Sequence, residues 1–267
     1  MMASASSTAL RASAVDHARA LPADTFRRRY VAPRRPVVLP GHAADWPALR
    51  GWSLDHLQSW LGAVEMTVIR SNAGRVIMDD ARGSVEARMK LGSFIEALRD
   101  GSQDLYLTSR LRDLPEHARR EVPRPDCTRA TWQDGNVWIG PAGTVAPTHR
   151  DLADNLHVVI SGRKRFTLVA PRHSARLYPH RLFDPFPNGC RVDIEDPDFV
   201  NFPQLKRVET LVTELQAGDA IYIPRRWWHH VRTLETAVSV NYWWADGARW
   251  VVILAADTFK RIRGISR

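Results

Sequence analysis

Short runs in which apolar residues dominate, each broken by Gly, Pro or Asp, fill the chain from about residue 132 to residue 245. Most of these runs are rich in β-branched and aromatic side chains, which favour strands. The strand-like runs are GNVWIGPAG, LHVVISG, RFTLVAP, TLVTELQAGDAIYIP, HHVRTL and AVSVNYWW. Closely spaced strands separated by turn residues predict an antiparallel barrel or jelly roll for this part of the chain.

The N-terminal part has a different pattern, in which two segments carry apolar residues at helical spacing. WSLDHLQSWLG contains Ser53 as an N-cap residue, and LGSFIEALRDG contains Ser93 as an N-cap with Glu96 three residues later. Gly101 follows the second segment and predicts its end. Strands are expected in RPVVLPGHAADWPA (35–48), with a turn at Pro40-Gly41, in VEMTVIRS and in DLYLTSRL.

These patterns predict a mainly β protein with flanking N-terminal helices. We expect residues 1–25 to be a flexible segment and residues 26–267 to be one domain, with a helical part (26–130) and a β core (131–250). The opening segment lacks the apolar stretch of a secretory signal. The longest apolar run, WVVILAA, is too short to cross a membrane and is expected to be a buried strand or helix segment.

Composition adds two constraints. The two cysteines, Cys127 and Cys190, form no CxxC pair, which argues against a disulfide framework or a zinc-cysteine site and favours the cytoplasm. The formal net charge is +9, carried mostly by scattered arginines. A basic protein of this kind either binds a polyanion such as RNA or has an ordinary solvated surface, and the charge alone does not distinguish the two.

Polar residues interrupt the apolar pattern at two places where strands begin or end. His149 and Asp151 are two residues apart, so on a strand they point to the same face and can share a divalent metal. Far downstream, GDAIYIPRRWWHHV ends in His229 and His230, which face opposite sides of a strand. One of the two histidines can complete a set of two imidazoles and one carboxylate, the arrangement of non-haem Fe(II) sites. The alternative is a pair of hydrogen-bonded histidines at the rim of a barrel.

Lys164 lies on the strand that follows the turn SGRKRF. A lysine inside an apolar barrel is costly unless an anion neutralises it, so an acidic cosubstrate of a neighbouring metal site is one explanation. The other is that Lys164 is a solvated turn residue.

The segments THRDLADNLHVVISGRKRFTLVAP, LQAGDAIYIPRRWWHHV, SVNYWW and DIEDPDFVNFP occur in an order that closely resembles the JmjC/cupin-like 2-oxoglutarate oxygenases. The resemblance covers about residues 132–245 and is strongest to the hydroxylase branch. That branch holds the asparaginyl hydroxylase of hypoxia-inducible factor and the tRNA wybutosine hydroxylase. The implied fold is a double-stranded β-helix, the jelly-roll or cupin core.

The resemblance also implies a site. Fe(II) would be held by His149, Asp151 and His229, because the metal histidine of this family directly follows the aromatic pair. Ala146 replaces a threonine that close relatives use, which removes one hydroxyl from the cosubstrate cradle. Either Thr148 or Tyr106 would have to compensate for this loss, or the cosubstrate would bind more weakly. Residues expected to bind the 2-oxoglutarate cosubstrate are Lys164, Asn155, Tyr106, Asn241 and Thr148, and Trp138 and Trp243 are expected to wall the substrate pocket.

The activity implied is hydroxylation of a C–H bond with O2, releasing succinate and CO2. The substrate would be a protein side chain, a modified tRNA base or a small metabolite. The alternatives are N-methyl demethylation by the same iron chemistry and an inactive cupin-like binding module. A homodimer and an RNA partner are further expectations, and Arg150, between the two predicted ligands, has no predicted role.

Overall fold

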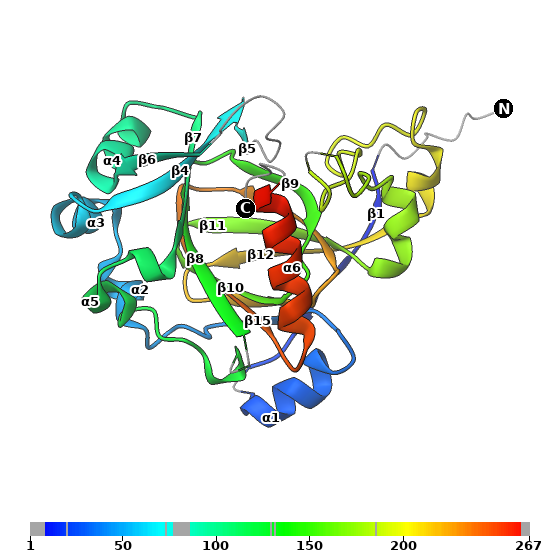
Figure 1. Ribbon diagram of the computed structural model, residues 1–267, viewed down its shortest axis with the longest axis horizontal. Helices are drawn as coiled ribbons and strands as arrows, with labels where there is room; N and C mark the ends of the chain where they lie inside the picture. The colour runs from blue at the N-terminus through cyan, green and yellow to red at the C-terminus, as the bar shows by residue number, and fades with distance from the viewer. Residues whose placement is uncertain are drawn as a thin grey trace.

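Eight strands form the centre of the molecule in the computed structural model, which describes residues 9–19, 21–72, 74–76, 86–128, 130, 132–184 and 186–262 (Figure 1). In chain order they are β8 (Trp132–Gly140), β9 (Val145–Arg150), β10 (Asp154–Ser161), β11 (Arg163–Val169), β12 (Glu209–Gln216), β13 (Ala220–Ile223), β14 (Trp228–Thr233) and β15 (Ala237–Ala245). All the strand runs predicted between residues 132 and 245 are therefore strands.

These strands are divided between two four-stranded antiparallel sheets. One sheet has the order β8-β15-β10-β13 and the other has the order β9-β14-β11-β12. Consecutive strands cross from one sheet to the other except β11 and β12, which are neighbours in the second sheet, and this is the topology of a double-stranded β-helix. The predicted fold class is confirmed.

Tight turns at glycine make the crossings short. Gly162 joins β10 to β11 with φ 74°, and Gly218 joins β12 to β13 with φ 91°. A Cβ on Gly162 would lie 2.3 Å from the carbonyl oxygen of Thr236, so this turn needs glycine for space as well as for backbone conformation.

The N-terminal part extends the first sheet and covers its outer face (Figure 1). β7 (Leu105–Arg110) pairs with β8, β4 (Glu65–Asn72) pairs with β7 and with β6 (Glu86–Lys90), and β3 (Val37–Leu39) pairs with β13. β5 (Arg75–Val76) joins β4 to β9 of the second sheet. The helices of this part are α1 (Ala23–Phe26), which continues into a π-helical turn (Arg27–Val31), α2 (Pro47–Gly51), α3 (Leu54–Leu61), α4 (Leu91–Arg99) and α5 (Glu116–Arg119).

One helix cap was predicted correctly and one was not. The Ser53 hydroxyl accepts a hydrogen bond from the amide of His56 at 3.2 Å and caps α3. Ser93 does not cap α4, because β6 runs directly into that helix and Lys90 occupies the N-cap position. The buried Leu91 fixes this earlier start, and Gly101 follows the helix end as predicted, with φ 86°.

Part of the segment expected to be flexible is paired in sheets. β1 (Arg11–Ala14) runs parallel to β12 at the edge of the second sheet, and β2 (Asp16–His17) runs parallel to β3 at the edge of the first. Edge strands offer unpaired backbone groups, and these six positions pair with such groups on both sides of the open seam of the barrel. Residues 1–8 lie outside the described residues.

Apolar side chains separate into three layers. The largest cluster lies between the outer face of the first sheet and the helices. A second cluster, containing Val15, Phe166 and Leu215, fills the barrel between the two sheets. A third packs the outer face of the second sheet against the segment 170–208, which lies on the opposite side of the barrel from α3 and α4 in Figure 1.

The C-terminal run WVVILAA forms part of α6 (Arg249–Ile262), which crosses the front of the barrel in Figure 1. Ile253 packs against Ala153 and Ala245, whereas Val251 and Val252 are exposed. The run is therefore helical but only partly buried, because a single helical face contacts the barrel. Within the described residues, no helix is long and apolar enough to span a membrane.

Candidate metal centre

His149 and His229 face each other across two neighbouring strands. They are directly paired in the antiparallel register of β9 and β14, and their ring centroids are 4.1 Å apart. Asp151 follows β9 immediately, and its Oδ2 lies 3.8 Å from Nε2 of His229. One ligand atom from each of the three residues lies within 4.8 Å of the others. The structure therefore brings together the three residues expected to bind metal.

Both imidazoles are oriented by the backbone two residues before them. Nδ1–H of His149 donates to the Pro147 carbonyl at 2.7 Å, and Nδ1–H of His229 donates to the Trp227 carbonyl at 3.2 Å. These bonds select the tautomer whose Nε2 carries the free lone pair, as is usual for metal-bound histidine. Burial, and then the nearby His229, lower the pKa of His149, which keeps its imidazole in the neutral form that binds a metal. This donor set fits a divalent metal.

A bulge in β9 determines which side chains face the barrel interior. Ala146 pairs with Val231 and His149 pairs with His229, so two residues of β9 lie opposite the single residue His230. Ala146 and His149 thus share the inner face, although they are three positions apart. His230 lies on the outer face, which agrees with the choice of His229 as the inner histidine.

Thr148 is the one predicted cosubstrate residue that the structure places elsewhere. Its hydroxyl lies 3.4 Å from Nδ1 of His230, on the outer face of the β9–β14 pair. The bulge is the reason, because it places Thr148 opposite His230 rather than toward the inner face. Thr148 therefore does not compensate for Ala146.

A chain of hydrogen bonds supports the carboxylate of Asp151. Oδ2 of Asp151 accepts from Nε1 of Trp243 at 2.9 Å and from Nδ2 of Asn155 at 3.3 Å. Asn155 accepts in turn from Asn241 at 3.1 Å, and Asn241 accepts from Nε1 of Trp138 at 2.8 Å. Four residues predicted for the cosubstrate and the pocket wall thus form one network, which orients the carboxylate beside the two histidines.

Lys164 is completely buried on β11, four positions before Leu168, the residue that pairs with His229. Its ammonium lies 3.2 Å from the Tyr106 hydroxyl and 5.5 Å from the centre of the Tyr106 ring, and its exposed fraction is 0%. Burial lowers the pKa of Lys164 to about 7. Within the described part of the chain, no carboxylate forms an ion pair with this lysine, so an anionic ligand is the group that would stabilise its charge. Of the two explanations that the sequence left open for Lys164, the solvated turn residue is therefore wrong.

Gly140 creates the space for the Tyr106 ring. A Cβ on Gly140 would lie 2.5 Å from Cε2 of Tyr106, a distance that no real contact tolerates. The ring therefore lies over the backbone of β8 and reaches Lys164. Gly140 is visible in the sequence as the last residue of GNVWIG. Its role beside Tyr106 could not be predicted, because it depends on the pairing of β7 with β8.

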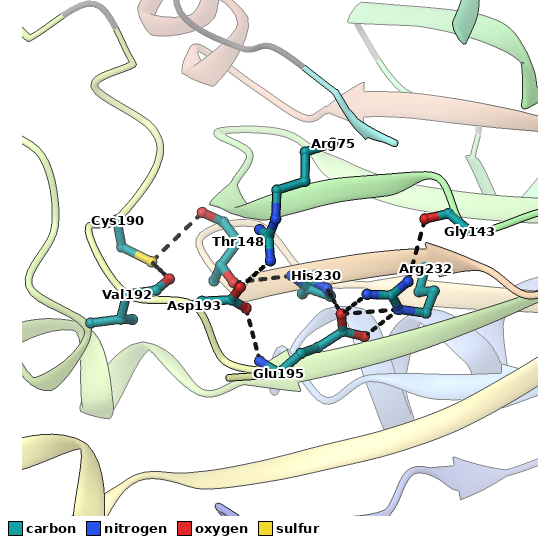
Figure 2. A network of polar contacts seen from close by, with 9 residues as sticks. All are labelled: Arg75, Gly143, Thr148, Cys190, Val192, Asp193, Glu195, His230 and Arg232. Atoms are coloured by element: carbon teal, nitrogen blue, oxygen red, sulfur yellow. Dashed lines mark hydrogen bonds and ion pairs between the residues drawn. The ribbon is translucent and has the colours of Figure 1, made fainter. Parts of the chain in front are cut away.

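A second polar network lies around the outer face of β14 (Figure 2). We call it the outer clamp, and it consists of Arg75, Asp193, Glu195, His230 and Arg232. Glu195 accepts two hydrogen bonds from Nε of Arg232, at 2.9 and 3.0 Å, and lies 3.2 Å from Nε2 of His230. Asp193 forms an ion pair with Arg75. Burial alone would raise the pKa of Glu195, but the contacts with His230 and Arg232 outweigh it and hold this pKa well below its ordinary value. The clamp fastens the segment 170–208 to the strand that carries His229.

Arg150, which had no predicted role, contacts an aromatic ring. Its guanidinium lies 4.6 Å from the centre of the Trp228 ring, and Trp228 is paired with it on β14. A cation over an aromatic face is favourable. Arg150 therefore braces the outer side of the strand pair whose inner side carries the two histidines.

Comparison with known proteins agrees with this fold and site. The family model for the cupin-like domain matches residues 22–249. The chain is 32% identical over 231 residues to lysine-specific demethylase 8 of Xenopus tropicalis, covering 82% of this chain and 50% of that protein. It is 27% identical over 256 residues to the bifunctional peptidase and (3S)-lysyl hydroxylase JMJD7 of Homo sapiens, covering 82% of this chain and 80% of that protein.

A third relative, Jumonji C domain-containing protein 5 of Drosophila melanogaster, is 27% identical over 241 residues, covering 83% of this chain and 57% of that protein. The chain thus spans about half the length of two of these three relatives. The finer resemblance to the asparaginyl and wybutosine hydroxylases stays a prediction. The cupin-like match, the double-stranded β-helix and the inward-facing His149, Asp151 and His229 together show that the chain belongs to the JmjC group of the cupin-like domain family.

Proposed function

We propose that this protein is an Fe(II)- and 2-oxoglutarate-dependent oxygenase that hydroxylates a C–H bond of a protein side chain. The observation that carries the proposal is the combination, in one barrel, of the His149–Asp151–His229 cluster with the buried Lys164. Two imidazoles and one carboxylate leave coordination positions open on Fe(II). When bound, iron and 2-oxoglutarate supply the oxidative chemistry, in which O2 converts the 2-oxo acid to succinate and CO2 and provides the hydroxyl oxygen.

The residues of the chain contribute binding and orientation. His149 and His229 present Nε2 because the backbone holds Nδ1–H, and the N–H groups of Trp243 and Asn155 fix the Asp151 carboxylate. Lys164 donates a charge-assisted hydrogen bond to the far carboxylate of 2-oxoglutarate, with the Tyr106 hydroxyl beside it. Lys164 lies on β11 four positions before Leu168, the residue paired with His229, and this separation favours a dicarboxylic 2-oxo acid over a monocarboxylic one.

The relatives support a protein side chain as the substrate. The names of the frog and human proteins refer to lysine demethylation and to lysyl hydroxylation, respectively. Hydroxylation of an N-methyl carbon leads to demethylation, so the same site chemistry serves both reactions. The net charge of +9 keeps an RNA substrate as the second candidate, and a strongly salt-dependent RNA affinity would favour it.

The first test is turnover of 2-oxoglutarate by the purified protein with added Fe(II). We expect succinate to form, and we expect Asp151→Ala to reduce its rate at least about a hundredfold because the only carboxylate ligand is lost. Asp100→Ala, at an exposed position after α4, is the matched control and should retain the wild-type rate. An Asp151→Ala rate close to that of the wild type would contradict the metal assignment, and an inactive wild type would favour a cupin-like binding module.

The second test identifies the reaction. Proteins from a cell extract are incubated with the enzyme, and their peptides are compared by mass spectrometry with an Asp151→Ala incubation. A gain of one oxygen atom on a side chain supports hydroxylation. Loss of a methyl group, with formaldehyde release, supports demethylation instead.

A further inference from the structure

We propose that His157 is a further cosubstrate-binding residue, whose imidazole hydrogen-bonds the far carboxylate of 2-oxoglutarate beside Lys164. This inference rests on the proposed function and adds a residue to its site. His157 lies in LHVVISG, which sequence analysis identified only as a strand.

The register of β10 places His157 on the inner wall of the barrel. His157 pairs with Asn241 on β15, and Asn155, two positions earlier, faces the same side and bonds Asp151. Across the barrel, the His157 ring meets the Phe166 ring edge to face at 5.1 Å. Phe166 shares its face of β11 with Lys164, which is two positions away. His157 therefore lies between the metal cluster and the lysine.

The electrostatic surroundings agree with this position. Burial lowers the pKa of His157 well below its ordinary value, and the proximity of Lys164 and then of His229 lowers it further. The imidazole is therefore neutral, with one N–H donor and one acceptor nitrogen. A neutral donor next to Lys164 can bind a carboxylate without adding a second buried positive charge.

The imidazole lacks partners of its own. Neither ring nitrogen of His157 hydrogen-bonds to another of the described residues, and Nε2 is wholly buried, while the residue as a whole is 8% exposed. Buried polar groups are rarely left in this state, so a bound group is expected to satisfy them. Ser239, one row further along the same wall opposite Val159, has a buried hydroxyl with no partner either. Two unsatisfied polar groups on adjacent rows of the same wall indicate a ligand with several oxygen atoms.

The test measures binding of N-oxalylglycine, an unreactive analogue of 2-oxoglutarate, to the full-length Mn(II)-loaded protein by calorimetry. We expect His157→Leu to raise its Kd about tenfold, because a hydrogen bond to a charged group is lost. His157→Gln, which keeps a donor, should stay within about threefold of the wild type. His173→Gln is the matched control, because His173 also has a buried Nε2 without a hydrogen bond but lies outside the barrel, in the helical turn Pro171–Leu177. Its Kd should equal that of the wild type.

Oxamate, which lacks the far carboxylate, locates the contact. We expect His157→Leu and the wild type to bind oxamate equally. Equal binding of N-oxalylglycine by His157→Leu and the wild type would overturn the inference. The inference would also be overturned if His157→Leu weakened oxamate binding as much as it weakened N-oxalylglycine binding, because His157 would then contact the part of the ligand at the metal. If the wild type binds Mn(II) but not N-oxalylglycine, the proposed function itself fails, and the inference fails with it.

Discussion

Lys164 shows how one residue can oppose folding and still be needed for binding. Its side chain is fully buried, its partner within the described residues is the neutral hydroxyl of Tyr106, and its pKa falls to about 7. Burial of the amine destabilises the ligand-free protein, and only the binding of an anion offsets this loss of stability. A residue placed in this way is more easily explained by a ligand than by stability.

Replacing Lys164 by Met should therefore separate stability from binding. We expect Lys164→Met to increase the free energy of unfolding by about 1–3 kcal/mol, because a buried polar group becomes apolar. The same variant should lose measurable affinity for N-oxalylglycine. Urea denaturation and calorimetry check the two halves, with the exposed Lys90→Met as the control. A Lys164→Met variant that is less stable than the wild type would show that the ammonium stabilises the free fold.

The same lysine predicts a pH dependence. Between pH 7 and about 10, the unfolded chain keeps the lysine proton while the folded protein releases it, so the unfolded state binds more protons. The free energy of unfolding should therefore rise with pH across this window. Urea titrations at several pH values measure the slope, and in Lys164→Met the rise due to this group should disappear. Equal slopes for the two proteins would contradict an amine with a pKa near 7.

At the scale of elements, the short apolar runs and the turn residues between them predicted the strands well, because both depend only on neighbouring positions in the sequence. The bulge in β9 could not be read in advance, since it depends on the register against β14. It is this bulge that places Ala146 inside and Thr148 outside. The start of α4 was missed for a similar reason, because the contacts of Leu91 outweigh the capping preference of Ser93.

The outer clamp makes a prediction at this scale. Glu195→Gln should lower the free energy of unfolding by about 1–2 kcal/mol, because the hydrogen bonds of Arg232 and the contact with His230 lose a charged partner. Glu214→Gln breaks a more exposed pair with Arg165 and should change stability by no more than about 0.5 kcal/mol. Thermal denaturation compares the two. Equal effects would mean that the contacts of Glu195 with Arg232 and His230 contribute little to holding the segment 170–208.

At the scale of the whole molecule, residues that sequence analysis treated as flexible close the seam of the barrel. β1 and β2 each join a different sheet, and Val15 between them is 2% exposed in the interior cluster. The sequence of this segment is rich in Ala, Ser and Arg and has little strand preference, so only the two sheet edges explain its pairing. The metal ligands, in contrast, were predicted from the order of the sequence motifs, which can be recognised without knowing the register of the strands.

Val15 tests this closure. We expect Val15→Ala to lower the free energy of unfolding by about 2 kcal/mol, because buried methyl groups are removed from the interior. Ser13→Ala, at an exposed position of β1, should have little effect. If the two variants were equally stable in urea denaturation, the segment would be loosely attached, as the sequence alone had indicated.

The central claim is that His149, Asp151 and His229 hold Fe(II) and that Lys164 binds the far carboxylate of 2-oxoglutarate. The most direct test of this claim uses neither O2 nor a prime substrate. Chelation of Fe(II) by a 2-oxo acid produces a visible charge-transfer absorption band, which anaerobic titration of 2-oxoglutarate into the Fe(II)-loaded protein would record. We predict a saturable band for the wild type and none for Asp151→Ala. No band in the wild type, or an equal band in Asp151→Ala, would contradict the account.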